Sequence, residues 1–214
     1  MFDGLFGGFY RFGETVFLLL YVNILWIFFT LIGLVIFGFG PSTVAMYTVF
    51  RKWSMGENDV PVFTTFWESY RKDFLKANAL GIVILAIGYM LYVNLNYFEL
   101  QGAWISVISR YLLLIAAAIY GIMAIYIFPL FVHYENKFFI YFKNSILVAI
   151  YHPIRTVYVI AACVTLYYLF SVIPVFIFLL GASLTSMVIM WIVYRTFLRI
   201  EYKQESLLEE QNVS

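Results

Sequence analysis

The chain has 214 residues, of which 64% are hydrophobic and 12% are charged, and its mean hydropathy is +0.91. Soluble domains carry about 25% charged residues, so the composition excludes an ordinary soluble protein and predicts an all-α, polytopic helical membrane protein. The net charge of +1 excludes a nucleic-acid footprint, because no basic domain is present to neutralise phosphates. Cys163 is the single cysteine, which excludes an intramolecular disulfide.

Segments without Asp, Glu, Lys or Arg define the expected membrane helices, each of which needs about 20 residues. These windows are Thr15–Phe50, Ala77–Phe98, Tyr111–Tyr134 and Thr156–Tyr194. They predict about five transmembrane helices in one domain (residues 1–200), at residues 16–39, 77–98, 111–132, 156–173 and 175–194. The last window holds two helices, separated either near Ser171–Pro174, where proline favours a helix start, or at Gly181-Ala182-Ser183.

The basic residues gather on one side of these helices. If five spans alternate, eleven of the thirteen share the side of the C-terminus, and only Arg11 and Arg110 fall on the other. Cytoplasmic loops carry the excess of Lys and Arg. The pattern therefore predicts an external N-terminus, a cytoplasmic C-terminus and a cytoplasmic tail at residues 201–214.

The first loop is expected to contain an interfacial amphipathic helix at about residues 60–76. Its aromatic residues recur at three- and four-residue spacing, and they are Phe63, Phe66, Trp67, Tyr70 and Phe74. Asp59 before Val60-Pro61 is a suitable N-cap. This aromatic face is expected to lie in lipid or to dock into a partner.

The end of the first span is rich in glycine, at Gly33, Gly38 and Gly40, followed by Pro41, Ser42 and Thr43. Proline disfavours the helical conformation in the residue before it, which predicts a break at Gly40-Pro41. This break is either a tight turn that leads to an interfacial helix or a discontinuous helix whose free N–H groups bind an anion or a sugar hydroxyl.

Few polar residues fall within the apolar stretches. Arg110 is expected at the outer interface, with a role as partner of Glu99 or of a ligand acid as the alternative. Asn23, Asn78, Asn94 and Asn144 are expected to form hydrogen bonds between helices.

The sequence predicts no enzyme, no metal site and no cofactor. His133-x-Glu135 and His152 are the only histidine-containing candidates, and a metal site needs three or four ligands in a defined geometry. Phosphate-binding glycine loops and nucleophile elbows are absent.

Four motifs carry a resemblance to a known family, and they are Asn23-Ile-Leu-Trp26, Gly38-x-Gly40-Pro41-Ser42-Thr43-x-Ala45-Met46-Tyr47, Arg51-Lys52-Trp53 and Phe66-Trp67-x-x-Tyr70-x-x-x-Phe74-x-x-x-Asn78. Over about its first eighty residues the chain resembles the YesL-like family of bacterial integral membrane proteins. Beyond that point the resemblance rests on hydropathy and on Lys143-Asn144-Ser145. It implies a plasma-membrane location, since such proteins are commonly encoded beside sugar-uptake and polysaccharide-degradation genes in Gram-positive bacteria.

The leading functional hypothesis is a non-enzymatic accessory or regulatory component of carbohydrate uptake. The alternative is a small sugar carrier, which needs a polar cavity at the membrane midplane. Expected partners are the lipid bilayer and a carbohydrate transporter complex, and the patterns define no oligomeric state. The candidate structural and interaction residues are Gly33, Gly38, Gly40, Pro41, Ser42, Thr43, Phe66, Trp67, Asn78, Arg110 and Asn144.

Overall fold

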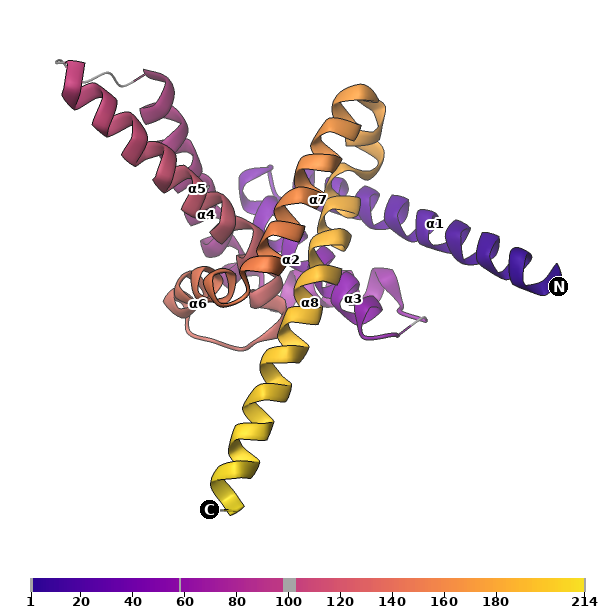
Figure 1. Cartoon of the computed structure of the whole chain (residues 1–214). Coiled ribbons are helices and arrows are strands. Elements are labelled where there is room, and N and C mark those ends of the chain that lie inside the picture. The colour runs from indigo at the N-terminus through magenta and orange to yellow at the C-terminus, as the bar shows by residue number, and fades with distance from the viewer. Residues whose placement is uncertain (1, 58, 98–102, 214) are drawn as a thin grey trace.

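The computed structural model describes residues 2–57, 59–97 and 103–213, and within these it is helical, with no strand. The helices are α1 (Phe2–Ile32), α2 (Ile36–Ser54), α3 (Val62–Lys72), α4 (Phe74–Tyr97), α5 (Ala103–His133), α6 (Phe138–Tyr151), α7 (Pro153–Val172) and α8 (Val175–Val213). Figure 1 shows α1, the pair α4 and α5, and the pair α7 and α8 leaving a central region around α2, with the C-terminal part of α8 leaving it alone in another direction.

Five of these helices are long and apolar enough to cross a membrane, as the sequence predicted. The candidate spans are Phe12–Ile32, Phe74–Tyr97, Trp104–His133, Pro153–Val172 and Val175–Lys203. The expected end of the second span, Phe98, lies outside the described residues. The last two helices separate at Ile173 and Pro174, which confirms the proline alternative, while Gly181 lies inside α8.

The predicted break at Gly40-Pro41 is wrong, because Pro41 lies inside α2. Pro41 is only the sixth residue of that helix, so its missing N–H removes a single bond near the helix start. The chain turns earlier, at Gly33, Leu34 and Val35, and both Leu34 (φ 55°) and Val35 (φ 65°) take left-handed conformations.

Two glycines make this turn possible. A Cβ on Gly33 would lie 2.3 Å from Cα of Gly38, and a Cβ on Gly38 would lie 2.4 Å from the carbonyl oxygen of Thr30. The turn keeps its backbone groups bonded, since the N–H groups of Gly33 and Val35 donate to the carbonyls of Phe29 and Thr30. The turn therefore satisfies these backbone groups with hydrogen bonds of its own, although its neighbouring side chains are apolar.

After the turn, α2 returns antiparallel to α1. Trp26 Nε1 donates to Thr43 Oγ1 at 3.1 Å, and the rings of Trp26 and Phe39 lie 6.2 Å apart. Further along, Glu14 of α1 and Trp53 of α2 line the same cleft of about 530 Å³. The α1–α2 hairpin (Phe12–Ser54) is therefore paired over most of the length of α2.

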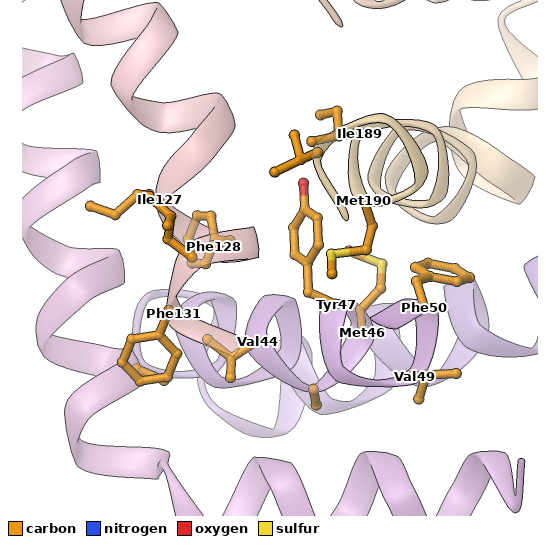
Figure 2. Packing of buried hydrophobic residues seen from close by; sticks show 14 of the residues in the cluster. Val44, Met46, Tyr47, Val49, Phe50, Ile127, Phe128, Phe131, Ile189 and Met190 are labelled. Atoms are coloured by element: carbon orange, nitrogen blue, oxygen red, sulfur yellow. The ribbon is translucent and has the colours of Figure 1, made fainter. Parts of the chain in front are cut away.

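Helix α2 is the centre of the hydrophobic core. Figure 2 shows Met46 and Tyr47 directed toward Ile189 and Met190 of α8. The ring of Tyr47 also stacks on Phe128 of α5, with centroids 6.0 Å apart. Elsewhere, α2 and α4 cross with Gly40 and Gly81 in close backbone contact. A Cβ on Gly81 would lie 2.9 Å from Cα of Gly40. These contacts leave α2 in contact with α1, α4, α5 and α8.

Helix α3 differs from the expected interfacial helix in its ends and in its contacts. It begins after Pro61 with no side-chain cap, so the predicted N-cap at Asp59 is wrong. Phe66 and Tyr70 are buried, and their rings lie 5.3 and 5.0 Å from the ring of Phe29 in α1. Phe66 and Tyr70 therefore pack inside the protein and Phe74 is half-buried, while Phe63 and Trp67 remain exposed.

Two further differences concern the second half of the chain. Helix α6 has 14 residues, is too short to cross a membrane, and was not predicted. Helix α8 continues as one helix to Val213, through most of the expected tail at residues 201–214.

Candidate functional site

A charged cleft of about 460 Å³ opens where the C-terminal ends of α2 and α5 meet α3. Thr48 and Arg51 come from α2, Thr65 and Ser69 from α3, and Tyr141 from α6. The remaining lining residues are Val44, Lys52, Glu68, Lys72, Asp73, Lys76, Phe131, Val132, His133, Tyr134, Glu135 and Asn136.

Positive groups outnumber carboxylates in this lining. Its cations are Arg51, Lys52, Lys72 and Lys76, and its carboxylates are Glu68, Asp73 and Glu135. Among the residues that the structure describes, no carboxylate lies within ion-pair distance of these four cations. The cleft therefore offers unpaired charge of both signs to a polar ligand or to a polar segment of another protein.

Arg51 and His133 join the ends of α2 and α5. Arg51 Nε donates to His133 Nδ1 at 3.1 Å. His133 Nε2 lies 2.9 Å from Glu201 Oε1, in the part of α8 that leaves the core. A guanidinium can only donate, so Nδ1 accepts and Nε2 carries the proton that bonds to the Glu201 carboxylate. The Arg51–His133–Glu201 relay thus fixes a neutral imidazole in one tautomer.

Aromatic rings hold this imidazole in place. The rings of His133 and Phe197 stack with centroids 4.7 Å apart, and Tyr134 meets His133 edge-on. Burial and the nearby Glu201 carboxylate raise the pKa of the Tyr134 phenol above its usual range. With both ring nitrogens engaged and the side chain only 7% exposed, the relay is a structural connection between three helices.

The turn between α5 and α6 is held by one phenol. Tyr141 Oη donates to the carbonyl of Tyr134 at 2.9 Å and accepts from the N–H of Asn136 at the same distance. These bonds fix the wall of the cleft at Glu135 and Asn136.

The two histidines that the sequence analysis considered do not come together. His133 is occupied by Arg51 and Glu201, while His152 lines a different cleft with Arg155. Within residues 2–57, 59–97 and 103–213, no three His, Cys, Asp or Glu side chains converge in a way that could hold a metal ion.

Several predicted candidates lie in the α1–α2 hairpin rather than in the charged cleft. Gly33, Gly38 and Gly40 permit close backbone approach, and Pro41 and Ser42 are buried along α2. Thr43 is also buried, and its hydroxyl donates to the carbonyl of Phe39. Because α2 runs through residues 40–43, the N–H groups of Gly40, Ser42 and Thr43 lie within the helix and do not form a free helix start.

The predicted asparagines have separate roles. Asn23 joins α1 to α8, donating to the carbonyl of Phe178 at 2.7 Å and accepting from the N–H of Ser183 at 3.1 Å. Asn94 instead bonds to the carbonyl of Met90 in its own helix, so the interhelical expectation is wrong for it. Asn78 is buried in α4, and its side-chain oxygen has no hydrogen-bond partner within the described part of the chain.

The other candidates lie apart from the cleft. Asn144 is half-buried in α6, and Arg110 is exposed near the start of α5. Its proposed partner Glu99 lies outside the described residues. Phe66 is a core residue, and Trp67 is 37% exposed beside Phe29.

The relay could not be found from the sequence. Glu201 lies 68 residues beyond His133, in a tail that carries several charges. The one local signal was a histidine at the end of an apolar window, where a buried ring needs polar partners.

The chain is similar to a known protein family and to three bacterial proteins. Residues 19–95, which include most of the α1–α2 hairpin and all of α3, match a family described as "Protein of unknown function, DUF624". No solved structure matches the chain. Three proteins of Bacillus subtilis (strain 168) are similar to it over most of their length.

These relatives are the uncharacterized proteins YteU, YesV and YesL. YteU is 36% identical over 93% of this chain and 89% of its own length, and YesV is 37% identical over 88% and 90%. YesL is 28% identical over 92% of this chain and 93% of its own length. The chain therefore belongs to the DUF624 family of YesL-like proteins.

Proposed function

We propose that this protein is a non-enzymatic component of the bacterial plasma membrane that assists or regulates carbohydrate uptake by contact with a transporter. The family resemblance implies the carbohydrate context. The observation that carries the contact mechanism is the charged cleft, whose four cations have no ion-pair partner among the described residues. A polar loop of a transporter subunit would supply the complementary groups.

The interior contacts favour this function over a carrier. The side-chain amide of Asn23 forms hydrogen bonds between α1 and α8, and Trp26 forms a hydrogen bond with Thr43 between α1 and α2. These polar groups act as links between helices, as expected for an accessory protein whose polar residues lie in dry helix contacts.

We also propose that the basic ends of α2, α3 and α8 face the cytoplasm, which gives a cytoplasmic C-terminus. For the N-terminal end, two arguments differ. Counting basic residues predicts an external N-terminus. The pairing of α1 with α2 instead brings Glu14 beside Trp53, two residues after Arg51, and so predicts that this end of α1 lies on the cytoplasmic side. We adopt the second argument, which puts the Phe12 end of α1 on the side of Arg51. In this arrangement α2 crosses back through the membrane inside the bundle, in addition to the five candidate spans.

The functional proposal is tested by replacing Lys72 and Lys76 with Gln in the full-length, tagged protein. The variant should still insert, since both lysines are exposed, but it should recover less carbohydrate-transporter complex from native membranes and slow growth on the matching oligosaccharide. The matched control replaces Lys137 and Lys143, which are also exposed and do not line the cleft. Equal recovery and growth for the two variants would remove the cleft as the contact site.

A liposome assay separates the accessory role from the alternative. Purified protein alone should not move sugar into liposomes. Uptake by the pure protein would show a carrier and would contradict the accessory proposal.

A further inference from the structure

A second cleft, of about 570 Å³, lies between the start of α7 and the middle of α8. Its charged lining residues are Arg155, Arg195 and Arg199, joined by His152, and the lining contains no carboxylate. The rest of the lining is Tyr151, Pro153, Ile154, Tyr158, Trp191 and Ile192. This arginine cleft is separate from the charged cleft at α2, α3 and α5.

The positive charge in the arginine cleft has no counter-charge in the described part of the chain. No carboxylate there lies within ion-pair distance of Arg155, Arg195 or Arg199. Burial, followed by the charges of Arg155, Arg199 and Lys203, lowers the pKa of His152. Three guanidinium groups in one hollow repel one another, so an anion bound among them would relieve the repulsion.

The first turn of α7 adds backbone donors to the same place. Pro153 opens this helix of 20 residues, and no side chain caps it. The N–H groups of Ile154 and Arg155 therefore have no acceptor within the helix, and both residues line the cleft. The positive end of the helix dipole points there as well, which favours an anion further.

The walls of the cleft are apolar and aromatic. Trp191 and Tyr158 are 45% and 63% exposed, and the Arg195 guanidinium lies 3.8 Å from the centre of the Trp191 ring. Arg155 is the third residue of the span Pro153–Val172, and Arg199 lies near the end of the span Val175–Lys203. The cleft is thus at the level where a membrane helix leaves the hydrocarbon, with charge beside apolar surface.

We propose that this cleft binds the phosphate group of an anionic membrane lipid. Arg155, Arg199 and the N–H groups of the first turn of α7 are the donors for the phosphate oxygens, and arginine matches them in geometry. Tyr158, Trp191 and Ile192 lie beside the apolar part of the lipid. A soluble phosphate shares the anionic chemistry but would not use this apolar wall.

Quenching of Trp191 fluorescence tests the proposal in the full-length protein. The other four tryptophans are replaced by Phe, and the protein is placed in phosphatidylcholine nanodiscs that contain either brominated phosphatidylglycerol or brominated phosphatidylcholine. Phosphatidylglycerol should quench Trp191 at lower mole fraction. R155Q and R199Q should each reduce this preference about fivefold, which corresponds to about 1 kcal/mol for each basic group. Equal quenching by the two lipids before any arginine is changed would overturn the proposal.

Three further variants test for an indirect effect. R155K and R199K keep the charge and should keep most of the preference, whereas a simple loss of folding would remove it in all four variants. K143Q, which removes an exposed charge outside the cleft, should leave the preference unchanged.

Inorganic phosphate distinguishes the two sources of the anion. Added at constant ionic strength, it should not reduce the preference for phosphatidylglycerol. If it abolishes the preference, the cleft takes soluble phosphate and the assignment to a lipid is wrong.

Discussion

Arg51 Nε donates to Nδ1 of His133 at 3.1 Å, across 82 residues of sequence, and joins the end of the central helix α2 to the end of α5. Glu201 completes the relay from α8.

Replacing Arg51 with Met should destabilise the protein by about 1–3 kcal/mol, because a buried acceptor on His133 loses its donor. Thermal unfolding in detergent measures the change. The double variant R51M/H133F removes both partners and should recover part of the loss, while K143M, at an exposed position, should unfold like the parent. Additive losses in R51M and H133F would contradict a direct interaction.

The substitution Gly38→Ala should open the turn of the α1–α2 hairpin, because the added methyl would lie 2.4 Å from the carbonyl oxygen of Thr30. We expect a loss of about 1–3 kcal/mol, as for other overpacked sites. Gly121→Ala is the matched control, since a Cβ there has nothing within 4 Å. Removing a glycine from the interior of α5 should leave the unfolding temperature unchanged or raise it. An equal response at the two glycines would show that the close contact is not required.

Phe66→Ala should be far more damaging than Phe63→Ala. Phe66 is fully buried against Phe29, so its truncation should cost about 3–5 kcal/mol, whereas Phe63 is 50% exposed. Unfolding midpoints of the two variants in the same detergent give the comparison. Similar midpoints would mean that α3 does not pack on α1.

Single cysteines in a Cys163→Ser background test the orientation. Gly13→Cys, at an open position near the start of the first span, and Ser206→Cys in the tail should both be shielded from impermeant reagents in intact cells. Trp104→Cys, near the N-terminal end of α5 and therefore on the opposite side of the membrane from His133, should react with the same reagents. Labelling of Gly13→Cys from outside would support the orientation derived from counting basic residues. Labelling of Ser206→Cys would overturn the cytoplasmic C-terminus as well.

The pKa of His152 should respond to anionic lipid. In neutral detergent, burial and the charges of Arg155, Arg199 and Lys203 hold this pKa below its usual value. Protonation of His152 therefore opposes folding. The stability contributed by the neutral imidazole is present above about pH 6.5 and declines as the pH falls through the lowered pKa. Phosphatidylglycerol should raise the pKa by partly cancelling the field of Arg155, Arg195 and Arg199. Proton NMR, with H133F to assign the signal, measures it, and an unchanged pKa would contradict lipid binding near His152.

The sequence predicted the helical class and the number of long apolar helices because both follow from hydropathy and charge. Of the two turns that the sequence offered between the last two helices, the structure has the one at Pro174, where a proline at a helix start is a local physical cause. The turn at Leu34 and Val35 was missed because both residues are apolar, and a charge-free window longer than one span does not show where the chain reverses. Pro41 was misleading because a proline near a helix start removes only one hydrogen bond.

The two clefts were missed for a different reason. The charged cleft is built from α2, α3, α5 and α6, which meet only in the folded chain. Arg155 and Arg199 entered the sequence argument only as charges on one side of the membrane. They line a shared cleft only because α7 and α8 pack against each other in the folded chain.

Helix α8 forms a wall of the arginine cleft and carries the last member of the relay. Arg199 and Glu201 are two residues apart, so they project about 200° apart around the helix axis, toward α7 and toward α5 respectively. Because α8 is unbroken from Val175 to Val213, any roll or slide that tightens Arg199 on an anion also moves Glu201 against His133. We therefore expect anion binding at Arg199 and the Glu201–His133 bond to be coupled, and by thermodynamic reciprocity each would change with the other.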